Sequence, residues 1–127
     1  MTYTNGEMDQ MIAVLEGYLD RTDKIGYAAA RNTRILQSEA YEYIQRKEAL
    51  IGKYGQPQLD DDGNPTGLTE LRFDSPKFKS FLEEIEEWAL IEHEPKLFKL
   101  PYDEAVCKLS GRELLALDWM FEDADRG

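Results

Sequence analysis

The longest helical pattern in the chain runs from Lys24 to Tyr54, a stretch without proline. Apolar residues recur there every three or four positions, which is the spacing of the buried face of a helix. Gly55 follows Tyr54 at the position where a glycine commonly ends a helix. The pattern therefore predicts one long helix over 24–54, with a buried stripe that two polar residues interrupt. The stripe consists of Ile25, Ala29, Asn32, Leu36, Ala40, Tyr43, Lys47, Leu50 and Tyr54.

A shorter helix is predicted before it. Thr4 and Glu7 have the T-x-x-E spacing of a capping box, and the apolar residues that follow trace one helical face. We expect this helix to end near Arg21 or Thr22. The short turn after it makes the two helices antiparallel neighbours, an αα-hairpin. Because the second helix is longer, its C-terminal half should pack on a later segment or on a second molecule.

The composition changes over residues 55–74, where glycine, proline and aspartate accumulate. We expect a flexible loop there that contains a short hairpin, with strands around 58–59 and 68–73. The aspartates at 60–62 invite a calcium interpretation, but their spacing to the next glycine and glutamate is not that of an EF-hand loop. A solvated turn is therefore the preferred interpretation.

Two further helices and an extended segment are predicted after this loop. Asp74-Ser75-Pro76 has the form of a helix start, and Ser110 with Glu113 repeats the capping-box spacing. Residues 91–100 alternate in polarity and contain a proline, so we expect an edge strand. The final helix is apolar on most sides and should be largely buried, and residues 122–127 should form a frayed polar tail.

The length of 127 residues and the hydrophobic content of 42% suit one domain with a real core. We expect a single α+β, mainly helical domain over residues 1–127, built from an αα-hairpin with one long central helix, two further helices and a small antiparallel hairpin with an edge strand. No apolar run approaches the about 20 residues of a membrane span, and the N-terminus lacks a secretory signal pattern. The single cysteine, Cys107, is expected to be a small buried thiol. These features predict a cytoplasmic protein without a membrane partner.

The charge of the chain is unevenly divided. The formal net charge is −11, so the overall field disfavours direct binding of nucleic acid. The segment 24–54 is nevertheless basic, with six basic and three acidic residues. At about 100° per residue, Lys24, Arg31, Arg46 and Lys53 lie in one arc beside the apolar stripe. They either pair with acidic groups of the same fold or form a docking ridge for an acidic partner, such as another copy of the chain.

The helix that begins near residue 74 is acidic in its C-terminal half, at Glu83, Glu84, Glu86 and Glu87. Negative charge at a helix C-terminus is mildly unfavourable, so these carboxylates should have an electrostatic partner, first of all the basic residues of 24–54. A metal site would need an E-x-x-H motif that this helix lacks. We therefore predict no metal ligands and no cofactor.

His93 is the only histidine of the chain. Its neighbours Glu92 and Glu94 would point to the opposite face of a strand, so a surface or half-buried histidine is the preferred interpretation. The sequence also lacks a glycine-rich phosphate loop, a C-x-x-C pair and an H-E-x-x-H motif. These absences predict a protein that is not an enzyme.

Several short motifs are similar to a known family. They are N-G-E at 5–7, A-A-R-N at 29–32, K-Y-G at 53–55, D-x-G-N at 61–64, D-S-P-K-F at 74–78 and L-S-x-x-x-L-x-A-L-x-x-M at 109–120. Their order resembles that of small phage and prophage proteins of unknown function, the DUF1617-like proteins. The resemblance covers nearly the whole chain, but the motifs are caps, turns and core residues, so it implies no functional residue. It does imply a phage-encoded, non-enzymatic protein in the cytoplasm of a bacterial host.

The function that we expect from the sequence is protein–protein binding without catalysis, with self-association into a homo-oligomer. The expected partner-binding residues are Lys24, Arg31, Arg46, Lys53, Glu83, Glu84 and Glu87, with Tyr27, Tyr41 and Tyr54 as interface aromatics. One alternative is an acidic DNA mimic that inhibits a nucleic-acid-binding host protein. Its binding surface would be Glu83, Glu84, Glu86, Glu87, Glu92 and Glu94. Another alternative is an enzyme built on His93, which requires a pocket that encloses this histidine.

Overall fold

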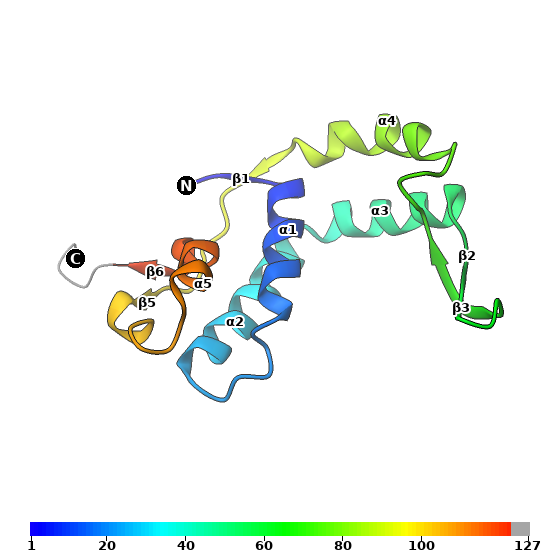
Figure 1. The fold of residues 1–127 in the computed structure, drawn as a ribbon. Coiled ribbons are helices and arrows are strands. Elements are labelled where there is room, and N and C mark those ends of the chain that lie inside the picture. Colours follow the sequence, from blue (N-terminus) through cyan, green and yellow to red (C-terminus); the bar gives the residue numbers. More distant parts are fainter. Residues whose placement is uncertain (123–127) are drawn as a thin grey trace.

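The structure is a computed structural model that describes residues 1–122. It confirms the mainly helical α+β class (Figure 1). The α-helices are α1 (Asn5–Glu16), α2 (Lys24–Glu39), α3 (Tyr41–Tyr54), α4 (Phe78–Ala89) and α5 (Gly111–Ala116). The strands are β1 (Tyr3–Thr4), β2 (Gln56–Leu59), β3 (Pro65–Glu70), β4 (Glu92–His93), β5 (Leu100–Pro101) and β6 (Phe121–Glu122). Short 3-10 turns occupy Tyr102–Glu104 and Asp118–Met120.

The helices pack around two apolar clusters. The first is built from α1, α2 and the segment from Leu100 to Phe121. The second lies between α3 and α4, around Tyr43, Leu50, Phe81 and Ile85. Figure 1 shows α1 beside α2 near the middle of the molecule, and α4 along α3 on its right. Each of the helices α1 to α4 therefore buries an apolar face against at least one neighbouring helix.

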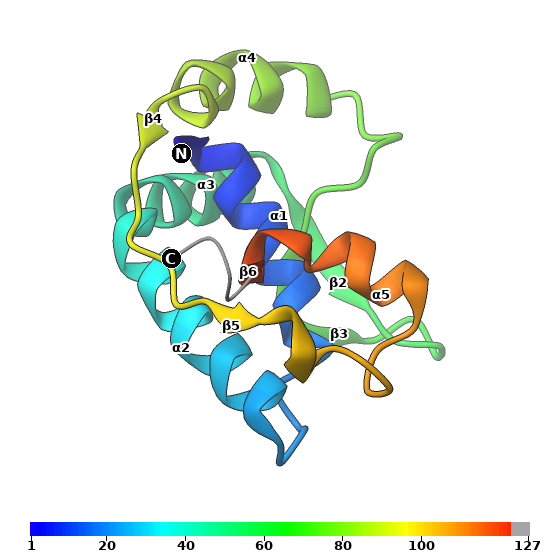
Figure 2. The same cartoon turned by 90° about the vertical axis from the view of Figure 1, so that its left-hand side faces the viewer.

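The predicted single helix over 24–54 is wrong, because it breaks at Ala40 into α2 and α3. The break changes the direction of the chain (Figures 1 and 2), with φ −95° and ψ 14° at Ala40. The Ala40 N–H still donates to the Leu36 carbonyl (2.9 Å), and the Ala40 carbonyl accepts from Ile44 N–H (3.0 Å). No glycine or proline stands at the break, so its cause is tertiary: α2 packs on α1, whereas α3 packs on α4.

The predicted stripe is nevertheless confirmed, since all nine of its residues are buried or half-buried. Its two polar members each make a specific contact. Asn32 donates from Nδ2 to the Phe98 carbonyl (2.9 Å) and accepts from the Phe98 N–H (2.7 Å). Lys47 Nζ lies 2.6 Å from Asp9 Oδ2, which joins α3 to α1. The polar interruptions thus tie the helices to other segments.

Both predicted capping boxes are confirmed. The Thr4 hydroxyl accepts from Glu7 N–H (3.1 Å) while the Glu7 carboxylate accepts from Thr4 N–H (2.9 Å). Ser110 and Glu113 make the same reciprocal bonds at 3.1 and 3.0 Å. These bonds satisfy amide groups that a helix start leaves unpaired.

The first helix is shorter than predicted. It ends at Glu16 rather than near Arg21 or Thr22. Gly17 stands at its C-terminus, and residues 17–20 form turns. Asp23 then caps α2 by accepting from Gly26 N–H (3.2 Å). The chain therefore uses the residues between Glu16 and Asp23 to reverse direction, which the apolar periodicity did not show.

The strands form three separate two-stranded sheets. The predicted hairpin within 55–74 is confirmed as the antiparallel pair β2–β3. The predicted edge strand over 91–100 is wrong in extent, because only two short parts of it pair, with different partners. The part at β4 pairs antiparallel with β1, where His93 faces Tyr3, and β5 pairs parallel with β6. The β1–β4 pair places His93 next to the start of α1.

The C-terminal segment also differs from prediction. The helix α5 has only six residues, and its Leu115 is 82% exposed, so it is not largely buried. The burial comes instead from the residues after it, Leu117, Met120 and Phe121. Part of the predicted tail, Glu122, pairs in β6, and 123–127 lie outside the described residues.

Cys107 is exposed rather than buried. It stands in a turn with a φ of 66°, in the left-handed region of the backbone. Across residues 1–122, no helix has both the length and the apolar character needed to cross a membrane.

Candidate functional site

The predicted basic arc is divided by the break at Ala40, and its α2 members contact groups of the same chain. Lys24 Nζ lies 3.2 Å from Glu104 Oε1. The Arg31 guanidinium lies over the Phe98 ring, 5.0 Å from its centroid, and donates to the Tyr27 hydroxyl (3.2 Å). These contacts fix the surface of α2 against the segment that follows α4.

The α3 members of the arc contact α4. The Arg46 guanidinium lies 4.1 Å from the centroid of the Trp88 ring, and Lys53 Nζ lies 3.5 Å from Glu84 Oε1. The Tyr54 hydroxyl and the Lys53 ammonium hold the pKa of Glu84 below its ordinary value. The predicted attraction between the acidic helix and the basic residues is therefore present at Glu84.

The other predicted carboxylates of α4 remain on the surface. Glu83 and Glu87 are exposed, and within residues 1–122 neither forms an ion pair. Glu83 lies one turn before Glu86, which lines the groove described next. The acidic side of α4 is thus available to a positively charged molecule.

A groove of about 700 Å³ lies between α1, α3 and α4, above the second cluster. We call it the apolar groove, because its walls include Ile51, Leu71, Phe73, Phe78, Phe81, Leu82 and Ile85. Phe73 is 88% exposed and meets Phe78 edge to face, with ring centroids 5.0 Å apart. Leu82 is 45% exposed. The Asp9–Lys47 pair and Glu86 supply the charged part of the lining.

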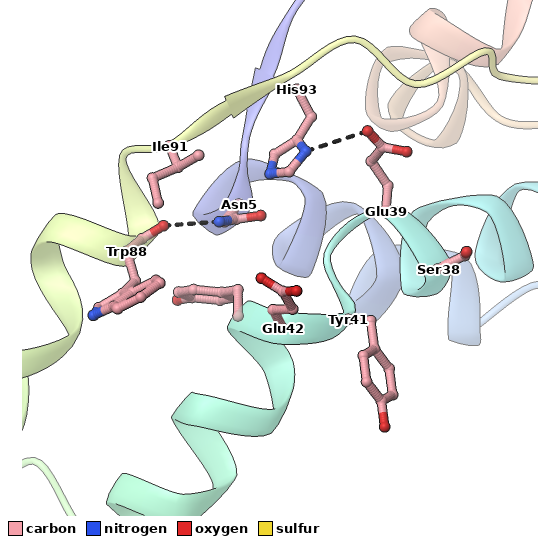
Figure 3. Close-up of a pocket in the computed structure, with 9 residues that line it drawn as sticks. Asn5, Ser38, Glu39, Tyr41, Glu42, Trp88, Ile91 and His93 are labelled. Atoms are coloured by element: carbon pink, nitrogen blue, oxygen red, sulfur yellow. Dashed lines mark hydrogen bonds and ion pairs between the residues drawn. The ribbon is translucent and has the colours of Figure 1, made fainter.

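A smaller cavity of about 390 Å³ lies at the junction of α2 and α3 (Figure 3). We call it the Glu39–His93 cavity, because His93 Nδ1 lies 3.2 Å from Glu39 Oε1 at its edge. Glu42, Tyr43 and Trp88 also line it. Burial raises the pKa of the Tyr43 hydroxyl, which stays neutral. His93 is half-buried, as predicted, and it borders a cavity, but it lies at the edge of this cavity.

The Glu39–His93 cavity lacks the contact of a nucleophile with a base. Ser38 lines the cavity, but in the described part of the chain it makes no hydrogen bond to His93. A nucleophilic hydroxyl needs a base within hydrogen-bond reach. In residues 1–122 no three histidine, cysteine, aspartate or glutamate side chains are grouped to hold a metal ion. The arrangement is suited to binding a ligand by hydrogen bonds and charge.

Asn5 is one of the lining residues to which the sequence analysis gave no binding role. It is 4% exposed, and its Nδ2 donates to the Trp88 carbonyl (2.9 Å). Its Oδ1 is buried without a hydrogen-bond partner among the described residues. Figure 3 shows this oxygen turned away from Trp88, on the side of Glu39 and Glu42. No signal in the sequence could have revealed it, since the donors and acceptors around it come from distant segments.

Comparison with known proteins gives no relative from which to transfer a function. No protein-family model, curated protein or solved structure matches the chain. The resemblance to the DUF1617-like proteins thus stays a prediction. The apolar groove and the Glu39–His93 cavity are the candidate sites that bear on its function.

Proposed function

We propose that this protein acts by binding another protein, and that its apolar groove receives a helix with an apolar face and positively charged flanks. The observation that carries the proposal is the exposure of Phe73 and Leu82 at a groove already lined by apolar side chains. Contiguous apolar surface of this kind marks interaction sites in proteins. Amphipathic helices bind such grooves through side chains spaced three and four residues apart.

The charge of the chain favours a basic partner. The net charge is −11, Glu86 lines the apolar groove, and Glu83 lies one turn before it on α4. Opposite charge at the rim accelerates and orients association. A second copy of the chain carries the same net charge, so its approach is opposed by repulsion.

Self-association through the basic arc has less support. Lys24 and Lys53 pair with carboxylates of their own chain, and Arg31 and Arg46 lie over aromatic rings of it. A second molecule would have to replace these contacts before it gained its own. The resemblance to phage proteins adds the cytoplasm of a bacterial host as the proposed setting, with no catalysis by the chain itself.

The test is fluorescence anisotropy with a labelled helical peptide made of leucine on one face and lysine elsewhere. In Leu82→Asp, the lost apolar contact should weaken binding about tenfold, since a buried leucine contributes about 1.5–3 kcal/mol. The added negative charge alone would tighten binding of a cationic peptide, so the two causes predict opposite signs. Leu115→Asp on α5 is the matched control, because Leu115 is exposed outside the groove. It should bind the peptide at least as well as the unaltered protein.

Equal affinities for both variants would refute the groove as the binding site. The same assay distinguishes the acidic-mimic alternative. Under that alternative, the double variant Glu83→Gln with Glu86→Gln would abolish peptide binding, and so would high salt. Leu82→Asp would then leave peptide binding unweakened. Light scattering without peptide tests whether a second copy of the chain occupies the groove. A dimer that Leu82→Asp converts to a monomer would show that a second copy fills the groove.

A further inference from the structure

The amide of Asn5 is fixed in one orientation. Its Nδ2 donates to the Trp88 carbonyl (2.9 Å), and its backbone N–H donates to the Ile91 carbonyl (2.9 Å). If the side-chain amide were flipped, its oxygen would face the Trp88 carbonyl oxygen. Both atoms are acceptors, so no hydrogen bond could form between them. The oxygen is therefore held on the side of the Glu39–His93 cavity (Figure 3).

This oxygen lacks a donor. Asn5 is 4% exposed, and its Oδ1 has no hydrogen-bond partner within residues 1–122. A buried acceptor left unpaired costs about 1–3 kcal/mol. A ligand that donates a hydrogen bond to this atom would recover that free energy, so the atom indicates a donor ligand.

The other groups of the cavity add negative charge. In the part of the chain that the structure describes, the Glu39 carboxylate pairs only with His93, and Glu42 forms no ion pair. Among residues 1–122, no lysine or arginine lines the cavity. Carboxylates that accept several hydrogen bonds are the usual partners of guanidinium and ammonium groups. The ligand that fits is therefore a cation that carries several N–H donors.

The walls of the cavity are suited to the same ligand. Tyr43 and Trp88 line it, and aromatic faces attract cations, Trp most strongly. The Trp88 ring already has one such neighbour, because the Arg46 guanidinium lies 4.1 Å from its centroid without lining the cavity. The two carboxylates outnumber that one positive charge.

We propose that the Glu39–His93 cavity binds a guanidinium or primary ammonium group, with Asn5 Oδ1 and the carboxylates of Glu39 and Glu42 as its acceptors. The proposal does not depend on the apolar groove or on its partner. Two sources can supply this chemistry, a basic side chain of another protein and a free small cation such as a diamine.

The test is an NMR titration of the protein with a cationic probe and a neutral probe. The probes are N-acetyl-arginine amide and its neutral analogue, N-acetyl-citrulline amide, which has nearly the same shape. The arginine probe should shift the signals of the Asn5 side-chain amide and of His93, and the citrulline probe should bind about tenfold more weakly or not at all. Glu42→Gln should weaken arginine binding about tenfold, whereas Glu48→Gln should leave it unchanged. Glu48 is the matched control because it is an exposed glutamate of α3 outside the cavity.

Equal binding of the arginine and citrulline probes would overturn the proposal, and so would equal effects of Glu42→Gln and Glu48→Gln. Two further probes separate the sources of the cation. Tighter binding of putrescine than of the arginine probe would support a free small cation. Tighter binding of a neutral peptide with one central arginine would support a protein side chain.

Discussion

Asn32 provides a direct test of how the first cluster is held together. Its side chain is fully buried, and it exchanges two hydrogen bonds with the backbone of Phe98. Asn32→Leu keeps a similar volume but leaves the Phe98 N–H and carbonyl without partners. Each unpaired buried group costs about 1–3 kcal/mol. Because Phe98 is only half-buried, water relieves part of that cost, and we expect a loss of about 3 kcal/mol in the free energy of unfolding.

Asn32→Asp separates the two hydrogen bonds by their pH dependence. The carboxylate still accepts from the Phe98 N–H, but it faces the Phe98 carbonyl without a proton to donate. Burial raises the pKa of the introduced carboxyl above its unfolded value of about 3.9. The destabilisation is therefore complete above the folded pKa and declines as the pH falls through it, since the protonated form can donate to Phe98.

The assay is urea unfolding followed by circular dichroism, at neutral pH and at about pH 5, with the unaltered protein measured at both. A loss of 3 kcal/mol should lower the urea midpoint by about 1–3 M, because the slope is about 1–3 kcal/mol/M. Gln37→Leu is the control, since Gln37 is exposed on the same helix, and it should change stability by less than about 0.5 kcal/mol. If Asn32→Leu behaves like Gln37→Leu, or if the deficit of Asn32→Asp is the same at both pH values, the reasoning is refuted.

Two further predictions concern the helix starts and glycines. Gly26→Ala should destabilise by about 3 kcal/mol in thermal unfolding, because its Cβ would lie 2.1 Å from the Arg21 carbonyl oxygen. A Cβ added at Gly52, in the last turn of α3, would meet no atom of another segment within 4 Å, so Gly52→Ala should stabilise by about 0.5–1 kcal/mol. The same sign for both changes would contradict the structure. The hydrogen-bonded Arg21 guanidinium lowers the pKa of Asp23 to about 2, so the stabilisation from Asp23 is present above its unfolded pKa and is lost as the pH falls toward 2. Asp23→Asn should flatten that acid dependence, and an NMR titration of Asp23 with an ordinary midpoint near about 3.9 would disprove the pairing.

The parts of the fold that the sequence predicted correctly are those that local spacing decides. The two capping boxes involve residues three positions apart, and their reciprocal bonds need no other segment. The buried stripe follows from the helical period alone, so it survives the break at Ala40 and correctly includes Asn32 and Lys47. Periodicity shows which side of a helix is buried, but it does not show against what.

The errors arise where distant segments decide the outcome. Ala40 is a good helix former, so nothing local predicts a break there. The periodicity of the final helix predicts burial, but α5 has only six residues, and the chain after it supplies the core instead. Cys107 lies among apolar residues of the sequence, yet it stands exposed in a turn.

In the candidate sites, too, the sequence predicted the pairing that follows from its charge pattern and missed the cavity that distant segments form. The attraction between Glu84 and Lys53 followed from charge pattern alone and is present in the structure. The Glu39–His93 cavity could not be predicted, because its residues come from α1, α2, α3, α4 and β4. Only the packing of α4 on α3 and the pairing of β4 with β1 bring them together.

The break at Ala40 connects the error in the fold to the proposed cation site. Glu39 and Glu42 are like charges that stand three residues apart in the sequence. The break falls between them, where α2 ends and α3 begins, and both carboxylates line the cavity beside the unpartnered oxygen of Asn5. Stability alone favours neither the two like charges nor the unpaired acceptor. A bound cation would compensate both, which is why we attribute the cavity to ligand binding rather than to an accident of packing.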